Sequence, residues 1–271
     1  MNGSEHMFYN AKEGKIIVQG KSFDYISFGK GNKTLIMIQG LNTRGVKGAS
    51  IPLAYMYRAF AKEYKVYLFE RRPDIKTDIT IRDMAADVAA CMDRLGIKSA
   101  DVLGVSQGGM IAQYLAIDRP DLVNKLVLAV TTARTNPKVE DAIEKWVGYT
   151  RNGDIKSLVY DMALRMYSEK YLKKYRILLP LLVIAQKPKD AERFIYLAKA
   201  CLTCSAYDEL DKIKCPVYVI GSSCDKVVGG ESSSELADKL KCGKYIYNDV
   251  GHALYEQAGD FSKKVLDFLT K

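Results

Sequence analysis

The chain has 271 residues, with 41 lysines and arginines against 32 aspartates and glutamates, so its formal net charge is +9. Hydrophobic residues make up 48% of the sequence, which excludes an intrinsically disordered chain, and 20 glycines and 7 prolines are too few for a collagen-like one. The length is sufficient for one large α/β domain or two smaller ones, with a sizeable hydrophobic core.

The first half of the chain alternates short apolar strands with helices. We expect strands over residues 15–19, 23–28, 34–38, 66–69, 101–105 and 126–130, and helices over residues 51–62, 83–95 and 107–117. Strands that are apolar on both faces and alternate with helices are typical of a parallel sheet covered on two sides. The sequence therefore predicts an α/β fold with a mostly parallel sheet flanked by helices.

This alternation stops after residue 130 and resumes near residue 206. The residues between have helical patterns, at 138–149, 155–167, 171–185 and 189–202. Afterwards we expect strands at 216–220 and 244–247 and helices at 231–241 and 255–269. The economical interpretation is one core domain, residues 15–130 and 206–271, interrupted by a helical insertion at 131–205. The insertion follows the end of a strand, where open α/β sheets bind their ligands.

Only two histidines are present, His6 and His252. His6 lies in an opening segment that resembles the remnant of an expression tag, and we interpret residues 1–14 as that remnant and a lead-in to the first strand. With His252 alone remaining, zinc or iron sites built from several histidines are not expected, and we predict no metal and no cofactor.

The sequence also limits the partners and the compartment. It has no run of five or more basic residues and no nucleic-acid motif, so we expect no nucleic-acid partner. The longest apolar run, residues 177–185, is far shorter than the roughly 18–20 residues of a membrane span. Without a signal-peptide pattern, the six scattered cysteines are expected to be reduced thiols in the cytoplasm. Cys201 and Cys204 form a C-x-x-C match that we interpret as buried thiols.

The motif that points to chemistry is the G-x-S-x-G pattern around Ser106. Gly104 and Gly108 flank the serine, and the pattern ends an apolar strand and begins a helix. In so tight a turn the glycines leave room for the neighbouring backbone, the strained serine presents its Oγ, and the helix N-terminus favours negative charge nearby. A non-catalytic turn or a phosphate-binding loop are the alternatives, although the G-x-G-x-x-G pattern of dinucleotide sites is missing.

A serine hydroxyl is a weak nucleophile unless a base removes its proton, and His252 is the candidate base. It follows Gly251 in a loop between the last predicted strand and the last predicted helix. Its other ring nitrogen needs an acceptor, for which we favour Asp225, just beyond the strand at 216–220. Asp249 is closer in sequence but is more compatible with a turn, and the segment after residue 130 offers no carboxylate.

Together these residues resemble the α/β-hydrolase fold family, in the form that carries a helical cap. The resemblance extends over about residues 15–269 and depends on the Ser106 turn, the Asp225 loop, Gly251-His252 and the order Ser, Asp, His. It implies an oxyanion hole formed by the backbone N–H groups of Leu41 and Gln107.

The sequence departs from the family in two loops. Gln39-Gly40 stands where the family usually has His-Gly, which leaves the backbone donors unaffected. The segment Glu70-Arg71-Arg72-Pro73-Asp74 lacks both glycines of the family's acidic-x-Arg-Gly-x-Gly segment, so the conformation of that loop is open, and we assign it no catalytic group.

The expected function is hydrolysis of a small or medium carboxylic ester, with a small-molecule acyl substrate as the partner. Ser106 would attack the carbonyl, His252 would accept its proton, and Asp225 would orient His252. A lactonase, thioesterase, iminopeptidase or acyltransferase would use the same residues. Two alternatives from other classes are a ligand-binding receptor with slow turnover and an interaction protein on an inactive scaffold.

The insertion, as a cap, is expected to select the substrate. Its candidates to line a pocket are Trp146, Tyr149, Tyr160, Met162, Met166, Tyr167, Leu178, Leu179, Leu182 and Tyr196. Of these, we predict Trp146, Tyr149, Met166 and Leu179 as substrate-binding, although such residues at helical spacing more often form the core of the cap. Residues 131–205 also hold 14 basic against 8 acidic residues, so the basic excess is either a solvated surface or attracts anionic substrates.

Overall fold

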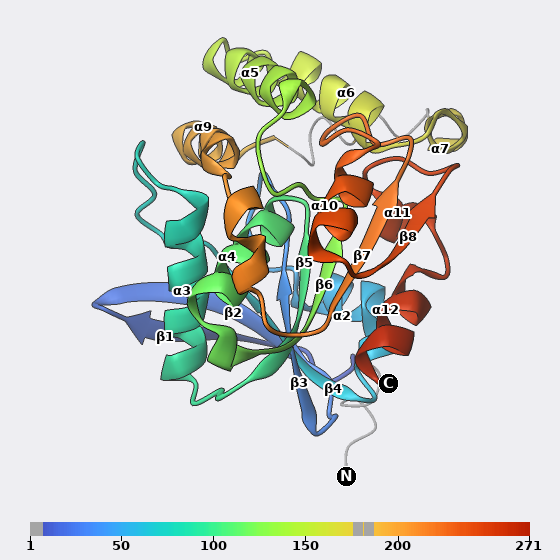
Figure 1. Cartoon of the computed structure of the whole chain (residues 1–271). Coiled ribbons are helices and arrows are strands. Elements are labelled where there is room, and N and C mark those ends of the chain that lie inside the picture. The colour runs from blue at the N-terminus through green and yellow to red at the C-terminus, as the bar shows by residue number, and fades with distance from the viewer. Residues whose placement is uncertain (1–7, 176–180, 182–186) are drawn as a thin grey trace.

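The computed structural model describes residues 8–175, 181 and 187–271, and His6 lies outside the described residues. All the predicted strands are present and form one eight-stranded sheet (Figure 1). The first strand begins at Lys12 rather than at residue 15. The strands are β1 Lys12–Val18, β2 Lys21–Phe28, β3 Lys33–Ile38, β4 Tyr64–Phe69, β5 Ala100–Val105, β6 Val123–Ala129, β7 Val217–Ser222 and β8 Gly243–Tyr247.

The strand order in this sheet is β1-β2-β4-β3-β5-β6-β7-β8. Strand β2 is antiparallel to both β1 and β4, whereas every neighbouring pair from β4 to β8 is parallel. Parallel strands end at the same edge of the sheet, so the loops that follow β3, β5, β6, β7 and β8 meet there. The predicted mostly parallel α/β sheet is therefore confirmed.

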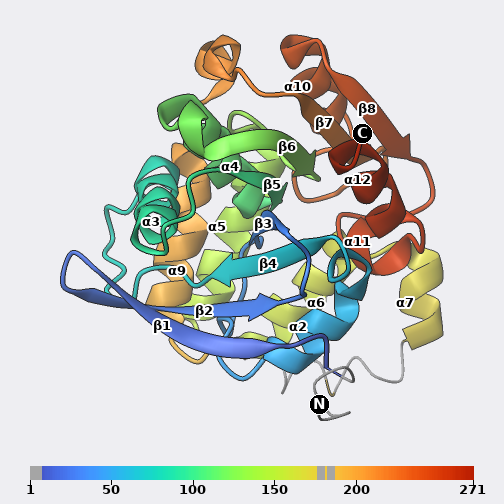
Figure 2. The same cartoon turned by 90° about the horizontal axis from the view of Figure 1, so that it is seen from below.

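Helices cover both faces of the sheet because its strands are apolar on both sides. Along β3, Ile36 and Ile38 pack into one buried cluster with residues of α3 and α4, and Leu35 and Met37 into a second cluster with residues of α2 and α12. Figure 2 shows α3 and α4 on one side of the sheet and α2 and α12 on the other. The helices of the core are α2 Ser50–Met56, α3 Ile81–Arg94, α4 Gln107–Asp118, α10 Ser232–Leu240, α11 Leu254–Gln257 and α12 Phe261–Leu269.

The segment between β6 and β7 is helical in its described part and gathers above one end of the sheet (Figure 1). Its helices are α5 Pro137–Arg151, α6 Ile155–Met166, α7 Glu169–Tyr175 and α9 Ala191–Ala200. Its two ends lie side by side, because Arg134 and Ser205 form a β-bridge and the N–H of Ala206 donates to the carbonyl of Ala133 at 2.7 Å. The chain therefore leaves the sheet and returns to it at nearly the same place.

Two predicted helices are wrong in extent. The helix expected over 51–62 ends at Met56, and a 3-10 turn at Arg58–Phe60 follows it. The helix expected over 255–269 is broken into α11 and α12, because Ala258 is extended (φ −94°, ψ 105°) and the Tyr247 hydroxyl donates to the Asp260 carboxylate at 2.6 Å, just before α12. Among the described residues, no helix combines the length and apolarity needed to cross a membrane.

Candidate active site

Ser106 occupies a strained turn between β5 and α4. Its backbone has φ 54° and ψ −122°, a conformation that residues with a side chain rarely adopt. The turn is packed closely against β3, since a Cβ added to Gly108 would lie 1.9 Å from the carbonyl oxygen of Ile38. A Cβ added to Gly104 would lie 2.6 Å from the carbonyl oxygen of Gly108. The glycines of the motif are thus required by close backbone approach, as the sequence predicted.

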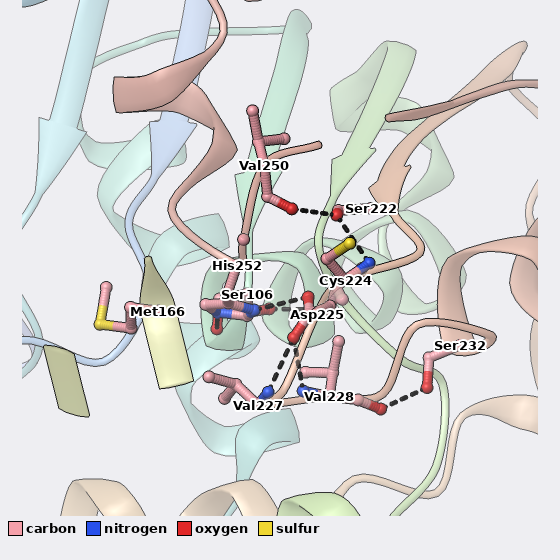
Figure 3. A network of polar contacts seen from close by, with 12 residues as sticks. Ser106, Met166, Ser222, Cys224, Asp225, Val227, Val228, Ser232, Val250 and His252 are labelled. Atoms are coloured by element: carbon pink, nitrogen blue, oxygen red, sulfur yellow. Dashed lines mark hydrogen bonds and ion pairs between the residues drawn. The ribbon is translucent and has the colours of Figure 1, made fainter. Parts of the chain in front are cut away.

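The structure brings the three predicted residues into one hydrogen-bonded chain (Figure 3). The Nε2 atom of His252 lies 2.9 Å from Oγ of Ser106, and its Nδ1 atom lies 2.7 Å from Oδ2 of Asp225. A carboxylate only accepts, so Nδ1 carries the proton and Nε2 is left to accept one from the serine. Asp225 and His252 are 5% and 4% exposed, which shields this pair from competing water.

The Asp225 side chain is oriented by its own loop. Its Oδ1 atom accepts hydrogen bonds from the backbone N–H groups of Val227 at 2.8 Å and Val228 at 3.0 Å, which leaves Oδ2 for His252 (Figure 3). The loops after β7 and β8 are joined, because the Ser222 hydroxyl donates to the carbonyl of Val250 at 2.5 Å. Asp249, the rejected candidate, is exposed on the surface.

The loop after β3 passes directly beside the serine. A Cβ added to Gly40 would lie 3.2 Å from Cβ and 3.6 Å from Oγ of Ser106, so the peptide groups next to Gly40 lie at the serine. Gln107 is the first residue of α4, where backbone N–H groups have no acceptor within the helix. Its side chain donates to the carbonyl of Leu197 at 2.6 Å and so joins this turn to α9. Both predicted oxyanion-hole residues, Leu41 and Gln107, thus adjoin Ser106.

The loop after β4, to which the sequence assigned no catalytic group, positions the β3 loop. The buried Arg71 side chain donates from Nη2 to the carbonyl of Gln39 at 2.6 Å, and Glu70 accepts from the N–H of Val46 at 2.6 Å. Burial lowers the pKa of the Arg71 guanidinium, which the charge of Glu70 partly offsets. That Glu70 and Arg71 hold the loop after β3 was not foreseen from the sequence. The acidic residue followed by arginine in this segment was the signal that could have indicated it.

Thr131 is a third residue that sequence reasoning missed. Its hydroxyl donates to the carbonyl of Ser106 at 2.8 Å, and its side chain fills the space beside Gly109, where an added Cβ would lie 2.6 Å from the threonine Cβ. The residue lies two positions after the end of β6, in the segment where the sequence offered no carboxylate. Through these two contacts Thr131 stabilises the serine turn.

Two cavities lie near the serine turn: Ser106 lines only the smaller one, whereas the larger is lined by its neighbour Val105 and by the loop after β3. The larger, of about 320 Å³, is bounded by the β3 loop, α2, the end of α6 and the start of α11. A volume of this size fits a small ligand. The smaller, of about 20 Å³, is lined by Ser106 itself, Gln107 and Trp146. Leu41 lines both cavities, so the loop after β3 lies between them.

The predicted pocket residues divide among several places. Met162, Met166 and Tyr167 line the larger cavity. Trp146 is buried at the smaller one, and its indole N–H donates to Asp161 at 2.8 Å. Tyr149, Tyr160 and Tyr196 line neither cavity, and Tyr149 and Tyr196 pack against the larger buried cluster. Tyr149 as a substrate-binding residue stays a prediction that these two cavities do not support. Leu178, Leu179 and Leu182 lie outside the described residues.

Sequence reasoning sought the lining only in the helical insertion and missed the part that the core supplies. Leu53, Met56 and Tyr57, in and just after α2, together with Tyr255 and Glu256 of α11, complete the wall of the larger cavity. No spacing signal marked them, since they come from opposite ends of the core. Cys201 and Cys204 are buried free thiols, as expected. In the part of the chain that the structure describes, no cluster of three or more potential metal ligands is found.

Comparison with known proteins places this geometry in a family. Residues 38–258 match the model of the alpha/beta hydrolase fold family. The candidate carbamate hydrolase RutD of Caulobacter sp. (strain K31) is 26% identical over 88% of this chain and 91% of that protein. The 2-hydroxy-6-oxononadienedioate/2-hydroxy-6-oxononatrienedioate hydrolase 2 of Pseudomonas putida is 25% identical over 98% of this chain and 96% of that protein.

A solved structure shows the same fold over nearly the whole chain. The enol-lactonase from Burkholderia xenovorans LB400 superimposes with a TM-score of 0.83 at 22% sequence identity, covering 95% of this chain and 100% of that one. The relatives and this neighbour are named as hydrolases of several bond types, which supports a hydrolase without fixing its substrate. Because the family model matches most of this chain, the chain belongs to the α/β hydrolase fold family.

Proposed function

We propose that this protein is a serine hydrolase that cleaves a carboxylic ester through an acyl-enzyme intermediate. The observation that carries the proposal is the hydrogen-bonded chain from Ser106 through His252 to Asp225, at the edge of the sheet where the strands end, with Asp225 and His252 buried. A serine held against the acceptor nitrogen of a histidine, whose other nitrogen faces a carboxylate, is an activated nucleophile.

In the proposed mechanism, each step belongs to a named group. Oγ of Ser106 attacks the ester carbonyl while Nε2 of His252 takes its proton, and the Asp225 carboxylate stabilises the resulting imidazolium. The backbone N–H groups of Leu41 and Gln107 hold the negative oxygen of the tetrahedral intermediate. As this intermediate collapses, His252 returns the proton to the departing alkoxide. Water, deprotonated by His252, then attacks the acyl-enzyme and releases the carboxylic acid and free Ser106.

The helical insertion at 131–205 would act as a cap over this site. Its two ends meet at one place on the core, and the carbonyl of Met166, at the end of α6, accepts from the N–H of Ala253 at 2.8 Å, next to His252. Met166 also lines the larger cavity. Because that cavity is small and mainly apolar, small or medium esters suit it best; lactones and carbamates, suggested by the names of the relatives, are the next classes to assay.

The test is hydrolysis of short p-nitrophenyl esters by the wild type and by Ser106→Ala. We expect the variant to lose at least about 10³-fold in kcat with its thermal unfolding unchanged. Ser262→Ala, in α12 and outside both cavities, is the matched control and should retain full activity. Wild-type rates in Ser106→Ala would refute the proposal. Saturable binding of esters without turnover would favour the receptor alternative instead.

A further inference from the structure

One charged side chain stands in the wall of the larger cavity. Glu256 lies on α11, four positions after His252, and it is the only ionisable acid or base other than tyrosine among the described residues that line this cavity. The remainder of that described lining is apolar or neutral, including Met162 and Met166 from α6. The basic excess of the insertion therefore does not make the described wall of the cavity basic.

The carboxyl of Glu256 is surrounded by tyrosines. The Tyr167 hydroxyl donates to Oε2 at 2.7 Å. Burial raises the pKa values of Tyr57, Tyr171 and Tyr255, and the nearby charge of Glu256 raises each of them further. Tyr171 in turn stacks on Tyr167, with ring centroids 4.9 Å apart. Tyr57, Tyr167 and Tyr255 thus share the cavity wall with this carboxyl, and Tyr171 stacks on one of them.

No described lysine or arginine forms an ion pair with Glu256. Its surroundings raise its pKa through burial, and the hydrogen bond from Tyr167 opposes that effect only in part. By solvent accessibility the residue is nevertheless exposed, so its carboxyl can be reached from solvent as well as from the cavity that it lines. Since no described cation pairs with it, this carboxylate can gain from a cation that arrives with a ligand, most of all where the ligand excludes water. Tyrosine faces attract such cations as well, especially quaternary ammonium groups.

We propose that the larger cavity selects an ester that carries an amine or quaternary ammonium group, and that Glu256 with its surrounding tyrosines binds that cation. The inference rests on the proposed function, because it places the cation of the ester in the larger cavity, which is lined by Val105, the residue before Ser106, and by the loop after β3. Glu256 would act in binding and has no part in the bond-breaking steps. The substrate class is thus a cationic ester, rather than the anionic one that the net charge of the chain would favour.

Two pairs of substrates of matched shape test the proposal. The first is choline acetate against 3,3-dimethylbutyl acetate, with the charge on the alcohol side. The second is methyl 4-(trimethylammonio)butanoate against methyl 5,5-dimethylhexanoate, with the charge on the acyl side. The readout is the cationic-to-neutral ratio of kcat/KM. We expect at least one pair to favour the cation in the wild type, and Glu256→Gln to lower that ratio about tenfold.

Control variants separate charge from structure. Glu256→Gln keeps an acceptor for the Tyr167 hydroxyl and removes only the charge. Glu144→Gln, an exposed glutamate of α5 outside the cavity lining, should leave the ratio as in the wild type. Binding of tetramethylammonium to Ser106→Ala, measured by calorimetry, reports on the cation site without turnover, and adding Glu256→Gln to that variant should abolish the binding.

The outcomes distinguish the two proposals. If neutral esters are hydrolysed through Ser106 but Glu256→Gln leaves both ratios unchanged, the cation site is wrong and the serine hydrolase stands. If no ester is hydrolysed but tetramethylammonium binds and the binding needs Glu256, the proposed reaction is wrong and the cation site stands. Absence of both binding and cation preference overturns the inference.

Discussion

Replacing Asp225 by asparagine tests the proposed mechanism at its most specific point. The two oxygens of Asp225 are not equivalent, because Oδ1 accepts from two backbone N–H groups and Oδ2 faces Nδ1 of His252. An asparagine in this place keeps its oxygen toward the backbone donors and turns its NH₂ toward His252. Nδ1 must then accept, so the ring proton moves to Nε2 and points at Ser106.

A histidine in that tautomer cannot take the proton of the serine, although every heavy atom remains in place. By comparison with the same change in serine proteases, we expect kcat to fall about 10⁴-fold, which corresponds to about 5.5 kcal/mol of transition-state stabilisation. The assay is p-nitrophenyl ester hydrolysis, with KM measured separately from kcat. KM should change little, since the substrate cavity is untouched.

Asp249→Asn provides the matched control, because Asp249 is an exposed aspartate of the loop that carries His252. It should retain wild-type kcat. Activity of Asp225→Asn within about tenfold of the wild type, in a variant that unfolds at the wild-type temperature, would refute the tautomer argument. A large loss in Asp249→Asn would show instead that the loop as a whole is sensitive.

Three further predictions concern packing and pH. Gly40→Ala places its Cβ 3.2 Å from Cβ of Ser106, so we expect kcat to fall about tenfold or more with little change in the melting temperature. An unaltered kcat would contradict the close approach of the loop after β3 to Ser106. Gly251→Ala places its Cβ 2.5 Å from the carbonyl oxygen of Met166 and should cost about 1–3 kcal/mol in unfolding free energy, whereas Gly259→Ala, with nothing within 4 Å, should cost almost none. Burial raises the pKa of Glu256 above its ordinary value of 4.5. Between the pKa of the unfolded state and the higher pKa of the folded state, the folded protein binds more protons, so its stability falls as the pH rises. Glu256→Gln should flatten this fall in melting temperature above pH 4.5, and an identical slope in both proteins would count against it.

Much of the fold was predictable because it follows from local patterns. Strands such as β3 bury alternate residues on two faces, and that double burial appears in the sequence as an unbroken apolar run. The extents of two helices were not predictable, since a tertiary hydrogen bond to Asp260 and an extended Ala258 interrupt the last one. Neither contact has a periodic signature.

The sequence by itself determined the candidates of the site. A glycine-flanked serine between a strand and a helix required a turn of one kind, and His252 was favoured as the base because it follows a glycine in a loop between a strand and a helix, downstream of that serine. The choice of Asp225 over Asp249 came from its place after a strand. The structure brings it within 2.7 Å of His252, since parallel strands deliver their loops to one edge.

Only the tertiary structure decided what surrounds those residues. Arg71 supports the β3 loop, Thr131 supports the serine turn, and Glu256 faces the cavity among tyrosines from α2, α7 and their neighbours. Each of these arrangements brings together segments that are far apart in the chain, and each depends on a few specific side-chain contacts. Local periodicity records which face of an element is buried, but it carries no information about which distant side chain will meet that face.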